Sequence, residues 1–391
     1  MGFVQKLDQY HDQAAALTGL DDFGEDDYLE PMKLVLEDYD RFNQFNPLGS
    51  SLVDAEMATR LAGRLLACDG FKRLGEQKPG ELESPLFVIG TARSGTTATL
   101  RLLARDPGVQ CLQYWLGAYP QVRPPRESWQ DNVYFQRVTS GLQQADELVP
   151  SYHQIHPEEA EEPDEDRLVT EQSFWACAMA SMATAPNYSE WCATADASYA
   201  YQYFKRVLCL IAGADSRPWV LKCPIHIWGL DSLLRVFPGA RIVFTHRDPL
   251  TSISSTASMV YELRKIRQEN VTPIQVGQEI LTNWGRVLDK SEQVRRACPN
   301  ARIIDITVDE IRLQPMQTID RIYAYFGLEL PASSRANIAA FCESDPTAGH
   351  SAHSYTPEDF GLSQGAVIEA IGSYWERNSN VRKESNIRLG I

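Results

Sequence analysis

The sequence predicts an α/β fold, in which helices flank a parallel β-sheet. Four short apolar runs are predicted as strands: LFVIG (86–90), WVLK (219–222), RIVFTH (241–246) and RIIDITV (302–308). Their apolar character is continuous rather than alternating, which is typical of parallel strands covered on both faces. A helix-like segment or a turn signal precedes each run, which favours helices between the strands. We therefore expect a ligand at the carboxyl ends of the strands.

Helical segments are predicted for much of the remaining chain. Residues 1–84 are expected to form a helical region packed on the core, with helices in PMKLVLEDYDRF (31–42) and SLVDAEMATRLAGRLLACDGF (51–71). Residues 85–391 are expected to form the α/β domain. The first two strands lie much further apart than a crossover helix requires, which indicates a mostly helical insertion at about 115–215 that covers the substrate.

Composition and charge exclude several classes of protein. A hydrophobic content of 43% and a charged content of 23% are typical of a folded globular chain. The net charge of −15 works against binding to nucleic acid or to an anionic membrane. The eight cysteines include no CxxC pair, so neither a zinc site nor a disulfide framework is predicted. Since neither a signal peptide nor a transmembrane run is present, we expect a soluble cytoplasmic protein.

The loop after the first predicted strand, GTARSGTT (90–97), has the composition of an anion-binding loop. A tight glycine-rich loop that leads into a helix points backbone N–H groups and the helix dipole at one place. An ATP-binding P-loop would carry Lys and then Ser or Thr after its second glycine. Here Thr96 and Thr97 follow Gly95, and the basic residue, Arg93, lies inside the loop. The loop alone is also compatible with a turn that binds no ligand.

A second polar segment follows the predicted strand 241–246. Arg247 comes directly after the strand, Asp248 suits the N-cap of a helix, and Pro249 suits its first position. Ser255 lies further along, in the hydroxyl-rich stretch TSISSTAS. Arg247 and a hydroxyl of the following helix are suited to bind a second phosphate. A capped helix with a surface Asp–Arg pair is the alternative.

Together the two segments resemble the sulfotransferases that use 3′-phosphoadenosine 5′-phosphosulfate (PAPS), and in particular the bacterial group often called type III. In that family a basic residue before Ser-Gly-Thr-Thr binds the 5′-phosphosulfate, and an Arg with a Ser eight positions later binds the 3′-phosphate. Further stretches that resemble the group, in chain order, are TGLDDFG, RSGTTATLRLLARDPG, WVLKCPIHIWGLDSLLRVFPGARIVFTHRDP and HSYTPEDFGLS. The resemblance therefore covers nearly the whole chain.

The resemblance implies a set of nucleotide-binding residues. Arg93 is expected to stabilise the leaving oxygen, and Tyr355 to line the nucleotide or substrate site. The Arg-Lys-Gly motif of the cytosolic enzymes is missing, and RKES (382–385) is a poor substitute. No metal is expected, because Arg93 and the loop amides already neutralise the charge. The expected nucleotide-binding residues are Thr91, Ala92, Arg93, Ser94, Gly95, Thr96, Thr97, Arg247, Ser255 and Tyr355.

Three further residues are candidates for the chemistry. His226 is the first choice for the base that deprotonates the acceptor, because it lies near the place of the catalytic His in the cytosolic family; the alternative is a packed helix-capping His. Glu165 is the second choice, and its alternative is a solvated acidic face. Lys222 is expected either to meet the transferring sulfonate or to end its strand as a surface charge.

The predicted activity is transfer of sulfonate from PAPS to a hydroxyl or amine of a small or lipid-like acceptor, by in-line displacement. A kinase-like P-loop phosphotransferase and a catalytically inactive PAPS-fold binding protein are the alternatives. The acceptor and the oligomeric state stay open, a homo-oligomer included. Most aromatic residues of the insertion are expected in the core; they are Tyr114, Trp115, Trp129, Tyr134, Phe135 and Trp175.

Overall fold

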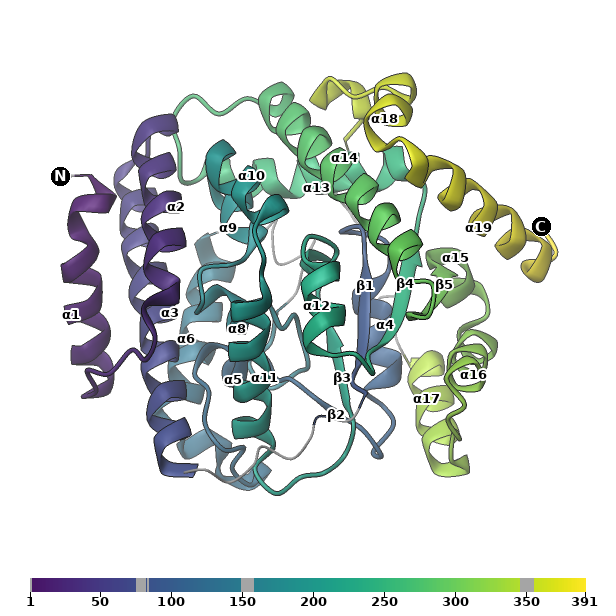
Figure 1. Ribbon diagram of the computed structural model, residues 1–391, viewed down its shortest axis with the longest axis horizontal. Coiled ribbons are helices and arrows are strands. Elements are labelled where there is room, and N and C mark those ends of the chain that lie inside the picture. Colours follow the sequence, from purple (N-terminus) through teal and green to yellow (C-terminus); the bar gives the residue numbers. More distant parts are fainter. Residues whose placement is uncertain (1, 75–81, 83, 149–157, 345–354) are drawn as a thin grey trace. The chain divides into compact units, whose positions relative to one another are not determined.

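A five-stranded parallel sheet is the central feature of the computed structural model, which describes residues 2–74, 82, 84–148, 158–344 and 355–391 (Figure 1). The four predicted runs are confirmed as strands. A further strand of two residues, β2, is not among those predicted, because so short a segment carries no apolar run. In the order β2-β3-β1-β4-β5, the strands are β1 (Leu86–Gly90), β2 (Gln110–Cys111), β3 (Trp219–Lys222), β4 (Arg241–His246) and β5 (Arg302–Thr307).

The chain divides into two compact units. The helical unit consists of Met1–Leu82, Leu112–Ser216 and Val260–Val271. The sheet unit consists of Glu83–Cys111, Arg217–Met259 and Thr272–Ile391, and it contains all five strands.

Strand β1 occupies the centre of the sheet, between β3 and β4. Val88 pairs with Lys222 of β3 on one side and with Val243 of β4 on the other. The direction of the strand order changes at β1, since β2 and β3 lie on one side and β4 and β5 on the other. In open parallel sheets, ligands bind at the carboxyl ends of the strands where the order reverses. The loop that follows Gly90 is at that place.

Helices cover the sheet and supply part of its core. Val88 and Ile304 of the sheet share one buried apolar cluster with Leu103, Ile319 and Tyr323 from two helices. The helices of the sheet unit are α4 (Thr96–Leu103), η4 (Pro224–Ile227), α12 (Leu230–Val236), α14 (Pro273–Ala297), α15 (Val308–Leu313), α16 (Pro315–Phe326), α17 (Ala332–Ser344), η5 (Pro357–Phe360), α18 (Gln364–Ile371) and α19 (Ser373–Leu389). Helix α13 (Pro249–Lys265) begins in the sheet unit and continues into the helical unit.

Side chains of α16 occupy the outer edge of β5. The Tyr325 hydroxyl donates a hydrogen bond to the carbonyl oxygen of Ile303, at 2.8 Å. The Arg321 guanidinium donates to the carbonyl oxygen of Asp305, at 3.2 Å. Two acceptors of the edge strand are therefore used by side chains of the same unit.

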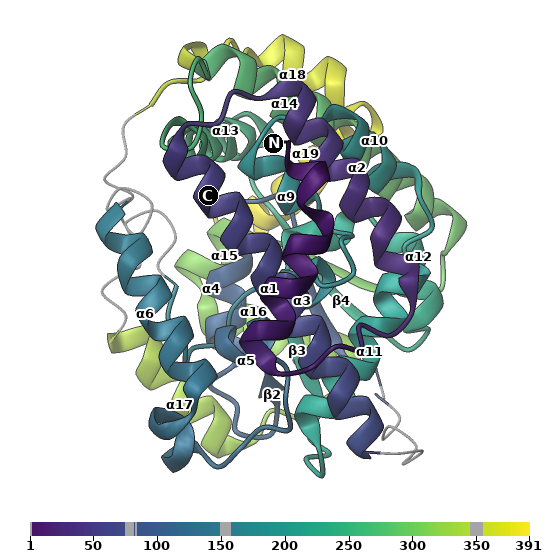
Figure 2. The same ribbon diagram turned by 90° about the vertical axis from the view of Figure 1, so that its left-hand side faces the viewer.

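The predicted helical N-terminal region and helical insertion are both confirmed. In the helical unit, α1 packs along α3 (Figure 2). The aromatic residues Trp115, Trp129, Phe135 and Trp175 are buried, as expected for a core. No helix among the described residues has the length and apolar character to cross a bilayer. The helices of this unit are η1 (Phe3–Lys6), α1 (Leu7–Thr18), η2 (Asp26–Tyr28), α2 (Leu29–Phe42), α3 (Pro47–Leu74), α5 (Tyr114–Ala118), η3 (Arg126–Asp131), α6 (Val133–Leu148), α8 (Arg167–Glu171), α9 (Cys177–Met182), α10 (Pro186–Thr194) and α11 (Ser198–Ala212).

Candidate active site

The glycine-rich loop leaves β1 through a backbone conformation that requires glycine. Gly90 has φ +154°, and a Cβ atom there would lie 2.2 Å from Oγ1 and 2.5 Å from the carbonyl oxygen of Thr245 on β4. At the other end of the loop Gly95 has φ +95° and is the N-cap of α4. Arg93, between them, has φ +66°, which is uncommon for a residue with a side chain. Strained backbone of this kind is frequent at ligand-binding loops.

Buried hydroxyl groups fix the shape of this loop. The Ser94 hydroxyl donates to the carbonyl oxygen of Thr91 at 2.5 Å, and its oxygen lies 2.6 Å from Oγ1 of Thr245. Ser252 of α13 donates to the carbonyl oxygen of Ala92 at 2.6 Å and contacts Oγ1 of Thr91 at 2.9 Å. Ser94 and Thr91 therefore hold the loop in its conformation through hydrogen bonds of their hydroxyl groups. Ser252 was not predicted; its only sequence signal is its place in the hydroxyl-rich stretch.

The N-terminus of α4 presents backbone donors in this loop. Thr99 N–H donates to the Gly95 carbonyl at 3.0 Å, so the preceding amides, up to Ala98, precede the first intrahelical bond. No side chain of the described residues caps this helix start. Thr96 is buried and Thr97 is half-buried at its first turn. The arrangement can bind an anion, because the N–H groups and the positive end of the helix dipole coincide.

The two predicted motifs meet at the loop. Arg247 Nη1 donates to the carbonyl oxygen of Arg93 at 3.0 Å. Arg93 Nε donates in turn to the Ser255 hydroxyl at 3.4 Å. Asp248 caps α13 by accepting the Thr251 N–H at 2.9 Å, and Pro249 is the first residue of that helix. Arg247 and Ser255, which come from one distant part of the sequence, therefore lie beside Arg93 of the glycine-rich loop.

Lys222 and His226 lie on β3 and directly after it. Lys222 is the last residue of β3, level with Val88 of β1, and its side chain is buried. His226, in η4, has 0% exposure, and its ring lies edge-on to Phe87 with the ring centres 5.1 Å apart. Lys222 ends the strand next to β1 and His226 follows it, so both belong to the same carboxyl edge of the sheet as the loop.

Glu165 belongs to the helical unit, where it takes part in a half-buried ion-pair network. Its carboxylate lies 3.4 Å from Nε of Arg167, which also pairs with Glu171 at 2.7 Å and with Glu158 at 3.3 Å. Burial alone would lower the pKa of Arg167, but the neighbouring carboxylates, led by Glu171, raise it above its ordinary value. The carboxylate of Glu165 thus forms an ion pair with Arg167, whose guanidinium keeps its positive charge.

The segment around Tyr355 is described only in part. The Tyr355 ring lies edge-on to Phe360, with the ring centres 6.4 Å apart. His353, in the same stretch HSYTPEDFGLS, lies outside the described residues.

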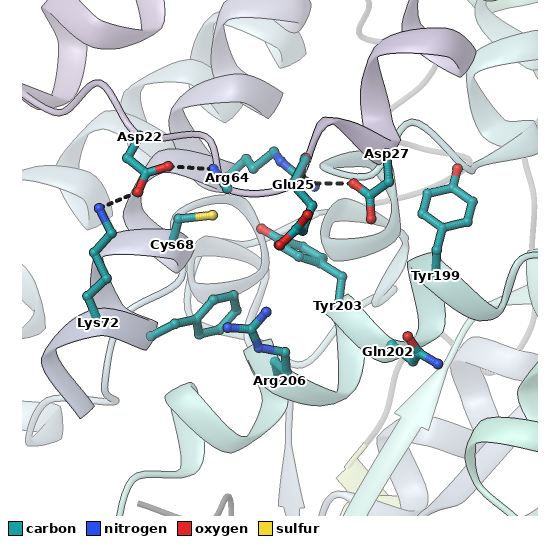
Figure 3. Close-up of a pocket in the computed structure, with 12 residues that line it drawn as sticks. Asp22, Glu25, Asp27, Arg64, Cys68, Lys72, Tyr199, Gln202, Tyr203 and Arg206 are labelled. Atoms are coloured by element: carbon teal, nitrogen blue, oxygen red, sulfur yellow. Dashed lines mark hydrogen bonds and ion pairs between the residues drawn. The ribbon is translucent and has the colours of Figure 1, made fainter. Parts of the chain in front are cut away.

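A pocket of about 330 Å³ lies in the helical unit, between α3, α11 and the loop that follows α1 (Figure 3). Its charged side chains largely pair with each other: Asp22 with Lys72, and Asp27 with Arg64 at 2.8 Å. Since the guanidinium of Arg64 also donates to the carbonyl oxygens of Phe23 and Glu25, it holds the loop in place. This arrangement stabilises the loop that follows α1.

Comparison with known proteins places this chain in a family and identifies solved structures with the same fold. A family model described as "Sulfotransferase family" matches residues 85–332. The crystal structure of sulfotransferase STF1 from Mycobacterium tuberculosis H37Rv is 31% identical over 94% of this chain and 98% of that one, with a TM-score of 0.85. Sulfotransferase STF9 from Mycobacterium avium is 24% identical over 95% of this chain and 96% of its own, also with a TM-score of 0.85, and shares the fold. A comparison with curated proteins gave no match. The chain belongs to the sulfotransferase family.

Proposed function

We propose that this protein transfers the sulfonate group of PAPS to a hydroxyl or amine of a small or lipid-like acceptor in the cytoplasm. The observation that carries the proposal is the contact of Arg93 with both Arg247 and Ser255 at the N-terminus of α4. A nucleotide with phosphates at both its 5′ and 3′ positions requires two anion sites close together. The loop supplies one of them, and Arg247 with Ser255 supplies the other.

Different residues are assigned to the 5′-phosphosulfate and to the 3′-phosphate of the nucleotide. The amides from Gly95 to Ala98 and the hydroxyls of Thr96 and Thr97 are suited to the 5′-phosphosulfate. Arg247 keeps most of its five N–H donors for the 3′-phosphate, since only Nη1 is used by the loop in the described structure. Tyr355 is assigned to the nucleotide or acceptor site.

The chemical step places negative charge on the oxygen between phosphorus and sulfur. PAPS supplies the sulfonate, and the acceptor oxygen or nitrogen attacks sulfur in line as that bridging oxygen leaves. Arg93 and the loop amides stabilise the charge on the leaving oxygen, and Lys222 neutralises the sulfonate oxygens.

Removal of the acceptor proton is assigned to His226. Glu165, the other candidate, lies in the helical unit and is already paired with Arg167. His226 must come within about 3 Å of the acceptor to act. Because its ring is fully enclosed, the residues that cover it must move when the acceptor binds.

Calorimetry with adenosine 3′,5′-bisphosphate and adenosine 5′-monophosphate tests the proposal. We expect the bisphosphate to bind at least tenfold more tightly, because each charge-assisted hydrogen bond between Arg and phosphate contributes about 1.5–3 kcal/mol. Arg247→Ala should abolish this preference. Arg312→Ala, which removes an exposed arginine of the sheet unit, is the matched control and should retain it. Equal binding of both nucleotides by the unmodified protein would refute the proposal, and magnesium-dependent binding of ATP would favour a phosphotransferase.

A further inference from the structure

A chain of buried and half-buried hydrogen bonds runs from the edge strand β5 to the backbone of Arg247. Arg295 Nη1 donates to Oδ1 of Asp305 at 2.9 Å, and the same oxygen lies 2.8 Å from Nε2 of His246. His246 Nδ1 lies 3.0 Å from the Tyr374 hydroxyl of α19. His246 and Tyr374 both have 0% exposure, and their rings stack with an interplanar angle of 18°. The residue directly before Arg247 is therefore locked in place.

Asn378, one helical turn after Tyr374, completes the chain. Its Nδ2 donates to the carbonyl oxygen of Arg247 at 3.0 Å and to the Tyr374 hydroxyl at 3.4 Å. Because Asp305 is an acceptor, the hydrogen of a neutral His246 ring lies on Nε2, and Nδ1 accepts from Tyr374. The hydrogen bonds of this chain therefore all run in one direction. Asn378 donates to Tyr374, Tyr374 donates to His246, and His246 donates to Asp305.

The burial and hydrogen bonding of Asn378 indicate that its amide group has a specific structural role. The side chain has 0% exposure, and its Oδ1 has no hydrogen-bond partner in the described structure. A buried amide oxygen without a donor is unfavourable, and an apolar side chain of similar size would avoid this penalty. Rotating the amide would not help, because Oδ1 would then face the carbonyl oxygen of Arg247. The favourable contact that offsets the burial of this amide is the hydrogen bond from Nδ2 to the carbonyl oxygen of Arg247.

Arg247 is consequently held at two points. Asn378 holds its carbonyl oxygen, and the carbonyl oxygen of Arg93 holds Nη1 of its guanidinium. We propose that Asn378, supported by Tyr374 and His246, is a positioning residue that sets the direction of the Arg247 side chain for the nucleotide's 3′-phosphate. This inference rests on the proposed function, since it assigns the 3′-phosphate to Arg247.

The quantity that tests it is the ratio of the Kd for adenosine 5′-monophosphate to the Kd for adenosine 3′,5′-bisphosphate, measured by calorimetry. This ratio isolates the 3′-phosphate, whereas general destabilisation would weaken both nucleotides alike. Asn378→Ala should reduce the ratio about tenfold, the equivalent of one well-placed hydrogen bond, with little change for the monophosphate. Tyr374→Phe, which removes only the hydroxyl, should reduce it several-fold. Asn380→Ala, an exposed asparagine on the same helix, is the control and should leave it unchanged.

The outcomes separate this inference from the proposed function. A wild-type ratio near one refutes the 3′-phosphate pocket, and the positioning role with it. A large wild-type ratio that Arg247→Ala abolishes but Asn378→Ala retains refutes the positioning role alone. If Asn378→Ala does not fold, Tyr374→Phe decides, and an unchanged ratio in that variant overturns the inference.

Discussion

The close approach of Gly90 to β4 makes a sharp prediction about Gly90→Ala. The added methyl carbon would lie 2.2 Å from the hydroxyl oxygen and 2.5 Å from the carbonyl oxygen of Thr245. The carbonyl is part of a strand that pairs with β1 over its whole length, so it cannot move without disturbing the sheet. The hydroxyl lies against Ser94, so it cannot turn away without disturbing the loop.

The magnitude follows from two separate penalties. Overpacking of a tight contact costs about 1–3 kcal/mol. A non-glycine residue in a sparsely populated backbone region costs a further 1–3 kcal/mol, roughly. We therefore expect Gly90→Ala to lower the free energy of unfolding of the sheet unit by about 2–6 kcal/mol, and to weaken nucleotide binding because the loop shifts.

Thermal unfolding followed by circular dichroism, together with calorimetry of adenosine 3′,5′-bisphosphate, measures both effects. Gly141→Ala is the matched control, since Gly141 lies within the exposed face of α6 and no atom is within 4 Å of an added Cβ. That variant should be stabilised by roughly 0.5–1 kcal/mol, because alanine favours a helix. Wild-type Tm and wild-type affinity in Gly90→Ala would refute the reasoning.

The remaining predictions concern charge. Arg93→Ala should lower turnover of PAPS about 10²- to 10³-fold while changing nucleotide Kd much less, if Arg93 acts on the leaving oxygen; equal losses in steady-state kinetics and calorimetry would assign it to ground-state binding. His226→Ala should lower turnover about 10²- to 10⁴-fold and leave bisphosphate binding intact, whereas unchanged turnover would move the base to Glu165. Burial alone raises the pKa of Asp305, but the hydrogen bond from His246 and the charge of Arg295 hold it well below its ordinary value. Its contribution to stability is therefore complete above the ordinary Asp pKa and declines as pH falls toward the folded-state pKa. The Tm advantage of the wild type over Asp305→Asn should be constant from pH 7 to pH 5 and shrink on further acidification; a constant difference down to pH 2 would contradict this.

The sequence predicts those parts of the site that depend on local pattern. The strand, glycine loop and helix around Arg93 are contiguous, so apolar character and glycine spacing indicate them directly. Asp248 and Pro249 likewise indicate the start of α13, because Asp is a common N-cap residue and Pro is common at the first position of a helix. The meeting of Arg93 with Arg247 follows once both segments are placed at the ends of adjacent parallel strands.

Other parts depend on tertiary contacts that no local pattern carries. Asn378 lies in a polar helix and is separated from Arg247 by 131 positions, so nothing near it marks it as buried. Ser252 is one of several hydroxyl residues in its stretch, and only the fold selects the one that faces the loop. The enclosure of His226 against Phe87 depends on how η4 packs on β1, which the sequence pattern does not indicate.

The occupied edge of β5 has a consequence for the behaviour of the protein in concentrated solution. An exposed strand edge is a template on which another chain can add its own strand, and this is a common start of aggregation. Here Tyr325 and Arg321 already use two carbonyl acceptors along that edge. At the opposite margin of the sheet, β2 offers only two residues, too few to hold an incoming strand. Both margins therefore resist intermolecular strand addition, so the sheet should remain unextended at concentrations at which an open-edged sheet would begin to form fibrils.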